Sequence, residues 1–194
     1  MIPLVLASQS VYKRSLFSRL GLEFNAIEPL TEEVFQDGLT PLEQAENLSL
    51  QKAQSLMGSY PNSVIIGADQ VLAFDNRLLQ KPNTVENAVN QLKMMRGKEH
   101  QLYTAVSVLH KTKQFQYTGT VISRIKFYKE LSDAFLRKVV LADKTWDCVG
   151  GYKIESMGIS LMESCQTEDF TAIIGLPLMV ITRVLRKLGY YSDS

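Results

Sequence analysis

Cysteine is scarce in this sequence, which has only Cys148 and Cys165 among its 194 residues. The two cysteines lack CxxC spacing, and no histidine lies near either of them. Because two isolated cysteines do not make a disulfide framework, we expect two reduced thiols in a reducing compartment. The two histidines, His100 and His110, are too isolated to form a metal-binding pair, and we expect structural or solvent-facing roles for both.

Long apolar runs are also missing. No run approaches the ~20 apolar residues that a membrane-spanning helix needs. The N-terminal stretch 1–10 has a short apolar run but no basic segment before it, which is unlike a signal peptide. We therefore expect a cytoplasmic protein with no membrane partner.

The chain has no excess charge of either sign. It contains 21 Lys and Arg against 20 Asp and Glu, which leaves a net charge of +1. This balance argues against a polymeric nucleic acid as partner, although it leaves room for a local basic pocket that binds a small anion. The hydrophobic fraction of 45% and the even spread of proline and glycine favour a single soluble domain over residues 1–194.

Short apolar runs alternate with helical periodicities along the chain. We predict strands at 3–7, 22–27, 63–68, 102–109, 115–128 and 154–162, and a hairpin formed by 71–74 and 78–79. We predict helices at 11–20, 42–57, 84–95, 131–141 and from Pro177 to Gly189, with Val11 on the apolar face of the first helix and Met179 on that of the last. Interleaved strands and helices with one antiparallel pair indicate an α/β fold, in which helices flank a mixed sheet.

A first candidate site follows the first predicted strand. Ser8 and Ser10 precede a helix that carries Lys13 and Arg14. The free N–H groups at a helix start attract anions, and the two hydroxyls and two cations would strengthen that attraction. The pattern is weak by itself, because serine helix caps followed by basic residues on a solvated face are common.

A second candidate is Asp69, which we place at the carboxyl end of the strand 63–68. Open α/β sheets bind ligands at this edge, where a carboxylate can hold a divalent cation or accept a proton from water. Glu33, after the second strand, could share such a metal ion. The alternatives are a turn-forming aspartate and a glutamate in a solvated loop.

Further candidates are the single lysines Lys52 and Lys81 and the segment Gly150–Glu155. Paired glycines allow a close approach of backbone to a ligand, and Glu155 could accept hydrogen bonds from a base. Taken singly, the lysines are typical of surface charges and the glycine segment of an ordinary loop.

In combination, these pieces resemble the Maf family of nucleoside triphosphate pyrophosphatases. They occur in the family's order and cover about residues 2–188. The matching pieces are Leu6–Ser10 with Lys13 and Arg14, then Glu33, Lys52–Ala53, Ile66–Gln70, Lys81–Pro82, Gly97 with Tyr103–Ala105, Gly150–Glu155 and Ile174–Leu178.

The resemblance implies a cytoplasmic enzyme that hydrolyses a nucleoside triphosphate to the monophosphate and pyrophosphate. It implies a Maf/ITPase-like fold with two lobes around a nucleotide cleft, a divalent metal cation (Mg²⁺, Mn²⁺ or Co²⁺) and a homodimer as one oligomeric state. By position, the catalytic residues would be Asp69, Lys52 and Lys81, and the metal ligands Glu33 and Asp69. The substrate-binding residues would be Ser8, Ser10, Tyr12, Lys13, Arg14, Gln70 and Glu155.

Subfamilies of the Maf family differ at three positions, which here hold Tyr12, Gln70 and Glu155. An aromatic residue, Gln and Glu resemble the branch that hydrolyses 7-methyl-GTP, whereas the TTP/UTP branch typically has Arg, Thr and Gln. The sequence departs from the family's pattern in three places, with Lys13 for the usual Arg, Val11 for Pro, and Ser156 for Gly. Lys13 removes one bidentate phosphate contact but no reacting group.

Two rival functions remain. One is a pyrimidine triphosphate pyrophosphatase of the same family. The other is a catalytically silent nucleotide-binding regulator, in a family that is also associated with septum formation. Intact Asp69, Glu33, Lys52 and Lys81 favour the enzyme, because a silent relative is expected to have lost one of them.

Overall fold

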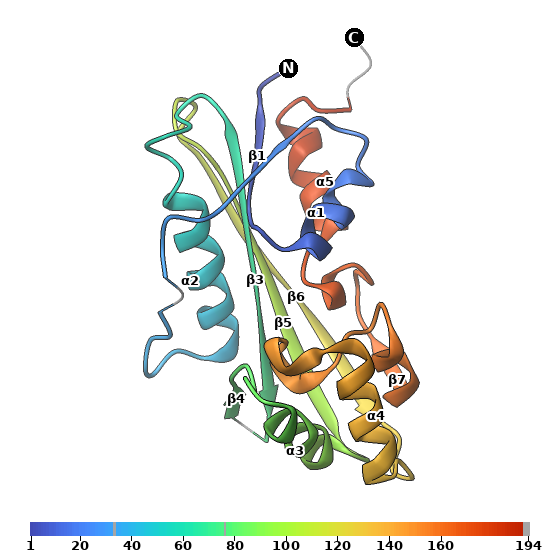
Figure 1. The fold of residues 1–194 in the computed structure, drawn as a ribbon. Coiled ribbons are helices and arrows are strands. Elements are labelled where there is room, and N and C mark those ends of the chain that lie inside the picture. The colour runs from blue at the N-terminus through green and yellow to red at the C-terminus, as the bar shows by residue number, and fades with distance from the viewer. Residues whose placement is uncertain (33, 76, 192–194) are drawn as a thin grey trace. The chain divides into compact units, whose positions relative to one another are not determined.

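Seven strands form one mixed sheet in this computed structural model, which describes residues 1–32, 34–75 and 77–191 (Figure 1). The sheet order is β2-β1-β3-β5-β6-β7, and β4 pairs with β3. The strands are β1 (Leu4–Ala7), β2 (Asn25–Ile27), β3 (Val64–Phe74), β4 (Arg77–Leu79), β5 (Glu99–His110), β6 (Phe115–Phe127) and β7 (Met162–Gln166). The helices are α1 (Val11–Ser18), α2 (Pro41–Gln54), α3 (Val85–Met95), α4 (Asp133–Asp143) and α5 (Leu178–Lys187). The predicted α/β class, with helices flanking a mixed sheet, is therefore confirmed.

The chain divides into two compact units. Unit 1 comprises residues 1–70, 104–121 and 169–194, and unit 2 comprises residues 71–103 and 122–168. The strands β3, β5 and β6 each contribute residues to both units, so that neither unit is a continuous piece of sequence.

In unit 1, β1 is buried on both faces because helices cover each of them (Figure 1). Leu4 and Leu6 pack in a cluster with residues of α1 and α5, whereas Val5 and Ala7 pack with residues of α2. This alternation follows from the two-residue period of a strand. The short apolar run therefore forms a fully buried parallel strand, which pairs with both β2 and β3.

Several helix starts lie where the sequence places them. Ser10, Thr40, Thr84 and Ser132 are the N-caps of α1, α2, α3 and α4, and each side chain accepts a hydrogen bond from a backbone N–H of the first turn. Thr40 also forms a reciprocal capping box with Glu43. These caps satisfy donors that a helix start otherwise leaves unpaired.

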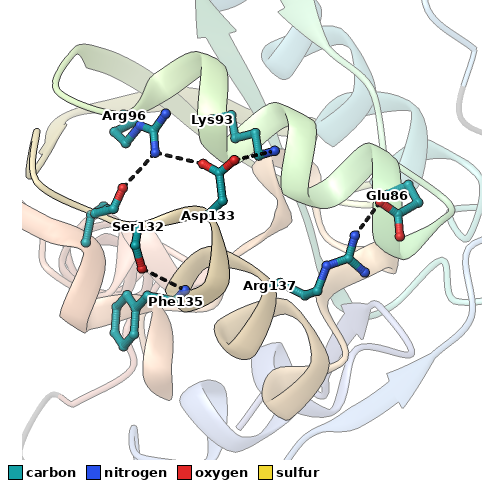
Figure 2. Close-up of polar contacts among 8 residues, drawn as sticks. Glu86, Lys93, Arg96, Ser132, Asp133, Phe135 and Arg137 are labelled. Carbon is teal, nitrogen blue, oxygen red and sulfur yellow. Dashed lines mark hydrogen bonds and ion pairs between the residues drawn. The ribbon is translucent and has the colours of Figure 1, made fainter.

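In unit 2, helices α3 and α4 pack together, and ion pairs between exposed side chains connect them (Figure 2). Asp133 accepts from Arg96 at 2.9 Å and from Lys93 at 2.8 Å, and Arg137 contacts Glu86 at 2.5 Å. The cations lower the pKa of Asp133 and of Glu86. Because these groups are exposed, their contribution to stability is small and depends on salt.

The buried rings of His100, Phe127 and Tyr152 pack together in unit 2. The His100 Nε2 lies 2.8 Å from the Tyr152 hydroxyl, and both rings pack edge-on against Phe127. The His100 Nδ1 has no partner among the described residues. Burial lowers the pKa of His100 to about 4, because a protonated ring would need a partner for Nδ1 in an apolar setting. His100 thus has the structural role that the sequence predicts.

The structure corrects two predicted elements and two predicted core positions. The stretch 154–162 is not a strand, since Met157–Leu161 is a 3₁₀ helix and β7 begins only at Met162. Glycine and serine within this stretch favour turns over extended backbone. Val11 and Met179 are exposed at 72% and 50% rather than buried, because each lies in the first turn of its helix and points away from the core.

The second corrected element is the strand that was predicted to end before Asp69, since Asp69 does not end a strand. The prediction separates 63–68 from 71–74, but β3 runs without a break from Val64 to Phe74 and forms the predicted hairpin with β4 through its last residues. It is β1 that ends at this level, where Ala7 pairs with Gly67. Asp69 therefore lies just past the end of the neighbouring parallel strand, on a stretch of β3 that β1 no longer pairs.

Both cysteines are free thiols, as predicted. Among the described residues, no helix has the length and apolar content that crossing a membrane requires.

Candidate functional site

The start of α1 in unit 1 is built from the two predicted serines. Ser10 caps the helix by accepting from the Lys13 backbone N–H, and the Ser8 side chain accepts from the Ser10 N–H at 3.1 Å. Ser8 is buried and directly follows β1. A strand, two hydroxyls and a helix start are thus adjacent, which is an arrangement suited to an anion.

Lys13 reaches from α1 to β3. Its Nζ donates to the backbone carbonyl of Ala68 at 2.7 Å, so the ammonium group lies beside the residue that precedes Asp69. The side chain passes close to Gly175, where a Cβ would come within 3.4 Å of the Lys13 Cε. The other two predicted residues of α1, Tyr12 and Arg14, are exposed on the same helix.

Asp69 and Lys52 form a buried ion pair between β3 and α2. About nine-tenths of each side chain is buried, with 10% and 11% exposed. A buried charge requires a partner, because removing one member of such a pair leaves the other without compensation in a region of low dielectric constant. The structure therefore brings together two residues that the sequence singled out separately.

Gly67 sets the distance between α2 and β3. A Cβ at this position would lie 2.7 Å from the Ala53 backbone nitrogen and closer still to the Ser49 carbonyl oxygen. Only glycine allows the helix backbone to approach the strand so closely. The approach lets the Lys52 side chain pair with Asp69, two residues along the strand.

Buried hydroxyls attach the same helix to the sheet. Ser49 Oγ lies 2.8 Å from Ser107 Oγ, which lies 2.9 Å from the Thr118 hydroxyl. Glu46 accepts from Thr120 at 2.9 Å. These contacts join α2 to β5 and β6 within unit 1.

The amide group of Gln70 is directed into the protein. Its Nε2 donates to the Thr104 hydroxyl at 2.8 Å and to the carbonyls of Ala172 and Ile173 at 2.9 and 3.2 Å. Backbone carbonyls only accept hydrogen bonds, and this fixes which end of the amide faces them. The acceptor Oε1 is the atom through which Gln70 could still contact a substrate.

In unit 1, each of three consecutive residues of β3 therefore has a different partner. Lys13 binds the carbonyl of Ala68, Lys52 pairs with Asp69, and Gln70 binds the turn at 172–173. The Asp69 carboxylate, its partner Lys52 and the Lys13 ammonium group on the Ala68 carbonyl combine a proton acceptor with binding groups for a polyanion.

The predicted residues of unit 2 are exposed. Lys81 precedes the buried Pro82, whose carbonyl accepts from the Asn87 side chain at 3.0 Å. Glu155 is exposed and follows the positive-φ residues Gly150 and Gly151. A Cβ at Gly151 would lie 3.0 Å from the Ala88 carbonyl oxygen, so Gly151 allows close packing against α3.

Glu33 lies outside the described residues. Among the residues that the structure does describe, no group of three or more His, Cys, Asp or Glu could hold a metal ion. Of the two predicted metal ligands, Asp69 is the one that the structure describes.

Sequence reasoning missed several residues that build this site. Gly67 and Thr104 belong to quoted motif pieces, but the sequence does not show that one adjoins α2 and the other binds Gln70. Asp169 is also missed. It accepts from the Met179 backbone N–H at 2.7 Å at the start of α5, and the sequence carries no pattern that predicts this contact.

Comparison with known proteins identifies the family of the chain. The model of the family described as Maf-like protein matches residues 3–188. Proteins named 7-methyl-GTP pyrophosphatase are 39% identical in Bordetella pertussis (96% of this chain, 92% of that protein) and 40% identical in Bdellovibrio bacteriovorus (94% and 95%). A protein of the same name from Pseudomonas aeruginosa is 35% identical over 97% of this chain and 98% of its own length.

Among solved structures, a HAM1 protein from Coxiella burnetii matches with a TM-score of 0.49 and 13% identity, covering 96% of this chain and 100% of that one. The sequence matches assign the family. These extend over nearly the whole length of both partners, and they include the Asp69, Lys52 and Lys13 segments that unit 1 brings together. The chain belongs to the Maf-like protein family.

Proposed function

We propose that this protein is a nucleoside triphosphate pyrophosphatase, which cleaves its substrate between the α- and β-phosphates. The observation that carries the proposal is the buried Asp69–Lys52 pair, together with the Lys13 ammonium group that binds the carbonyl of the preceding residue, Ala68. Family membership and relatives that are named 7-methyl-GTP pyrophosphatase support it.

Asp69 is the proposed proton acceptor. Water attacks the α-phosphorus, the bond from that phosphorus to the bridging oxygen breaks, and the water proton passes to the Asp69 carboxylate. The products are the nucleoside monophosphate and pyrophosphate. The Lys52 ammonium group and the rigid backbone of β3 fix the direction of the carboxylate, and such positioning is a large part of general base catalysis.

The cations and the α1 start would bind the triphosphate. Negative charge moves toward pyrophosphate as the bond breaks, so a fixed cation stabilises the transition state more than the bound substrate. Lys13 and Lys52 supply such charge in unit 1, with the Ser8 and Ser10 hydroxyls. Lys81 belongs to the same set by family resemblance.

A divalent cation fits the donor set of this site. Mg²⁺ prefers hard oxygen ligands and is usually held by one or two carboxylates together with the phosphates of the substrate. Asp69 offers such an oxygen on β3, and Glu33 is the second ligand that the family resemblance implies. When bound, the ion would neutralise charge on the phosphates.

The proposed substrate is 7-methyl-GTP. Methylation makes the guanine ring cationic, and a cation over an aromatic face gains ~0.5–2 kcal/mol. Tyr12 presents an exposed aromatic ring on α1, and Glu155 presents an exposed carboxylate. A carboxylate can accept both the N1–H and the N2–H of guanine, whereas thymine and uracil offer one N–H between two carbonyls.

The test is a pyrophosphate-release assay with 7-methyl-GTP, GTP, TTP and UTP, each with Mg²⁺, Mn²⁺ or Co²⁺. We expect activity with a preference for 7-methyl-GTP, and a loss of ~10²–10⁴-fold in Asp69→Asn. A preference for TTP or UTP would instead indicate the pyrimidine branch. Absence of turnover, with retained nucleotide binding, would indicate the silent regulator. Cytoplasmic location, a homodimer and the lack of a polymeric nucleic-acid partner stay predictions.

A further inference from the structure

Gln70 occupies a position at which the family's branches differ, so its expected role is contact with the base. The hydrogen bonds suggest a different role. The two N–H donors of its amide face three acceptor oxygens of the protein, on Thr104, Ala172 and Ile173. None of these donors is left for a nucleotide.

The turn that Gln70 binds is itself held firmly. Thr104 Oγ1 donates to the same Ala172 carbonyl at 2.9 Å. Asp169 accepts from the Thr171 backbone N–H at 3.0 Å and from the Met179 N–H at 2.7 Å. The Thr171 hydroxyl accepts from the Leu178 N–H at 2.8 Å. Asp169 and Thr171 thereby cap α5, which begins after Pro177 and has no cap from that residue's side chain.

The turn also adjoins the phosphate-binding lysine. It ends at Gly175, which has a φ of 105° and lies against the Lys13 side chain. A side chain at this position would be strained by the backbone conformation. Gln70 therefore joins β3 to a turn whose last residue, Gly175, adjoins the Lys13 side chain.

We propose that Gln70 is a positioning residue, whose amide locks the Ala68–Gln70 segment of β3 to the turn at 172–175. This proposal rests on the proposed function. In it, the Gln70 amide fixes the backbone on either side of the proton acceptor, with Lys13 bound to Ala68 on one side and the turn bound to Gln70 on the other. Gln70 acts through Asp69 and Lys13 and does not read the base with its N–H groups.

The variants Gln70→Met and Gln70→Glu test this role. Methionine keeps the length of the side chain and removes the amide, and an ionised glutamate presents only acceptors to the two carbonyls. We expect either change to lower kcat by about 10- to 100-fold, since small misplacements of reacting groups have costs of this order. The decrease should be similar for every triphosphate that the wild type hydrolyses, and the ratio of kcat/KM between 7-methyl-GTP and GTP should not change.

Thr104 gives a second, independent test. Thr104→Val removes the hydroxyl that accepts from Gln70 and donates to Ala172, and Thr104→Ser restores it. We expect the Val variant to lower kcat and the Ser variant to recover it. Combined with Gln70→Met, Thr104→Val should lower kcat by less than the product of the two single effects, because the residues share one network. Ser123→Ala is the matched control: it removes a buried hydroxyl bond to Thr167 in unit 2 and should leave kcat unchanged.

Three outcomes would contradict the positioning role. One is an unchanged kcat with an altered KM or substrate ratio in Gln70→Met, which would show that the side chain reads the base. Another is the multiplication of independent effects in the double variant. A third is a wild type that releases no pyrophosphate from any triphosphate, which would overturn the proposed function and this role together. Thermal unfolding of each variant separates loss of kcat from loss of fold.

Discussion

Acidification from pH 6.5 to pH 4 should destabilise the protein through His100. The side chain is 1% exposed, and its Nδ1 has no partner among the described residues. Its pKa is lowered from 6.5 to about 4 by burial. In this pH window the unfolded chain binds a proton at His100 and the folded chain does not, so the free energy of unfolding falls as the pH falls.

The magnitude follows from the difference between the two pKa values. Each pKa unit corresponds to ~1.4 kcal/mol, so the full window removes on the order of 3 kcal/mol, of which about 2 kcal/mol is lost by pH 5. Folded domains have ~5–15 kcal/mol of stability, so this loss is a large share. Glu86 and Asp133, whose pKa values are also lowered, lose their stabilising effect only below their ordinary values of 4.5 and 3.8.

The assay is urea unfolding at several pH values, followed by the fluorescence of Trp146, the single tryptophan of the chain, in unit 2. The control is His100→Gln, which keeps a polar group near the Tyr152 hydroxyl but does not titrate. Between pH 6.5 and pH 5 the variant should lose less stability than the wild type, by ~1.4 kcal/mol per pH unit. Parallel losses in the two proteins would refute the reasoning.

Three further predictions concern the proposed site. Gly67→Ala should destabilise the fold by ~1–3 kcal/mol through overpacking, and it should lower kcat because α2 must shift. Urea unfolding measures the first effect and steady-state kinetics the second, and a stable, fully active variant would contradict the close approach of α2 to β3. Lys52→Ala and Lys81→Ala should each lower kcat/KM in steady-state assays with 7-methyl-GTP, whereas unchanged values in both would make these lysines ordinary charges. Glu155→Gln should shift the ratio of kcat/KM for 7-methyl-GTP over TTP toward TTP, and an unchanged ratio would argue against base recognition by this carboxylate.

Local patterns predict much of this fold because they have local causes. The caps Ser10, Thr40 and Thr84 act within one helical turn, and the apolar run of β1 needs only burial on both faces. The strand predicted at 154–162 is wrong because packing against the rest of the protein decides whether this backbone is extended or helical. The pattern of apolar residues does not contain that information.

The site is predictable as a set of residues but not as a geometry. The sequence singles out Asp69 and Lys52, yet their pairing depends on an approach between α2 and β3 that only Gly67 permits. It selects Gln70 as a substrate contact, while the partners of its amide come from Thr104 and from residues about one hundred positions away. Long-range contacts of this kind have no periodicity by which sequence reasoning could find them.

The hydroxyls beneath α2 determine which residue meets Asp69. A helix that slips by about one turn puts each side chain in the place of the one four positions away, a shift of about 6 Å. Slippage in either direction would put an alanine, Ala45 or Ala53, where Ser49 meets the buried Ser107, and a leucine, Leu42 or Leu50, where Glu46 meets Thr120.

The same slip would present Leu48 or Leu56 to Asp69 in place of Lys52. Each shifted register would leave buried hydroxyls and a carboxylate without hydrogen-bond partners. The free-energy cost of burying such an unpaired group is larger than the net stabilisation from one hydrogen bond in the correct register. The polar contacts of α2 thus select a single registration of the helix on the sheet, and that registration is what delivers an ammonium group to the carboxylate.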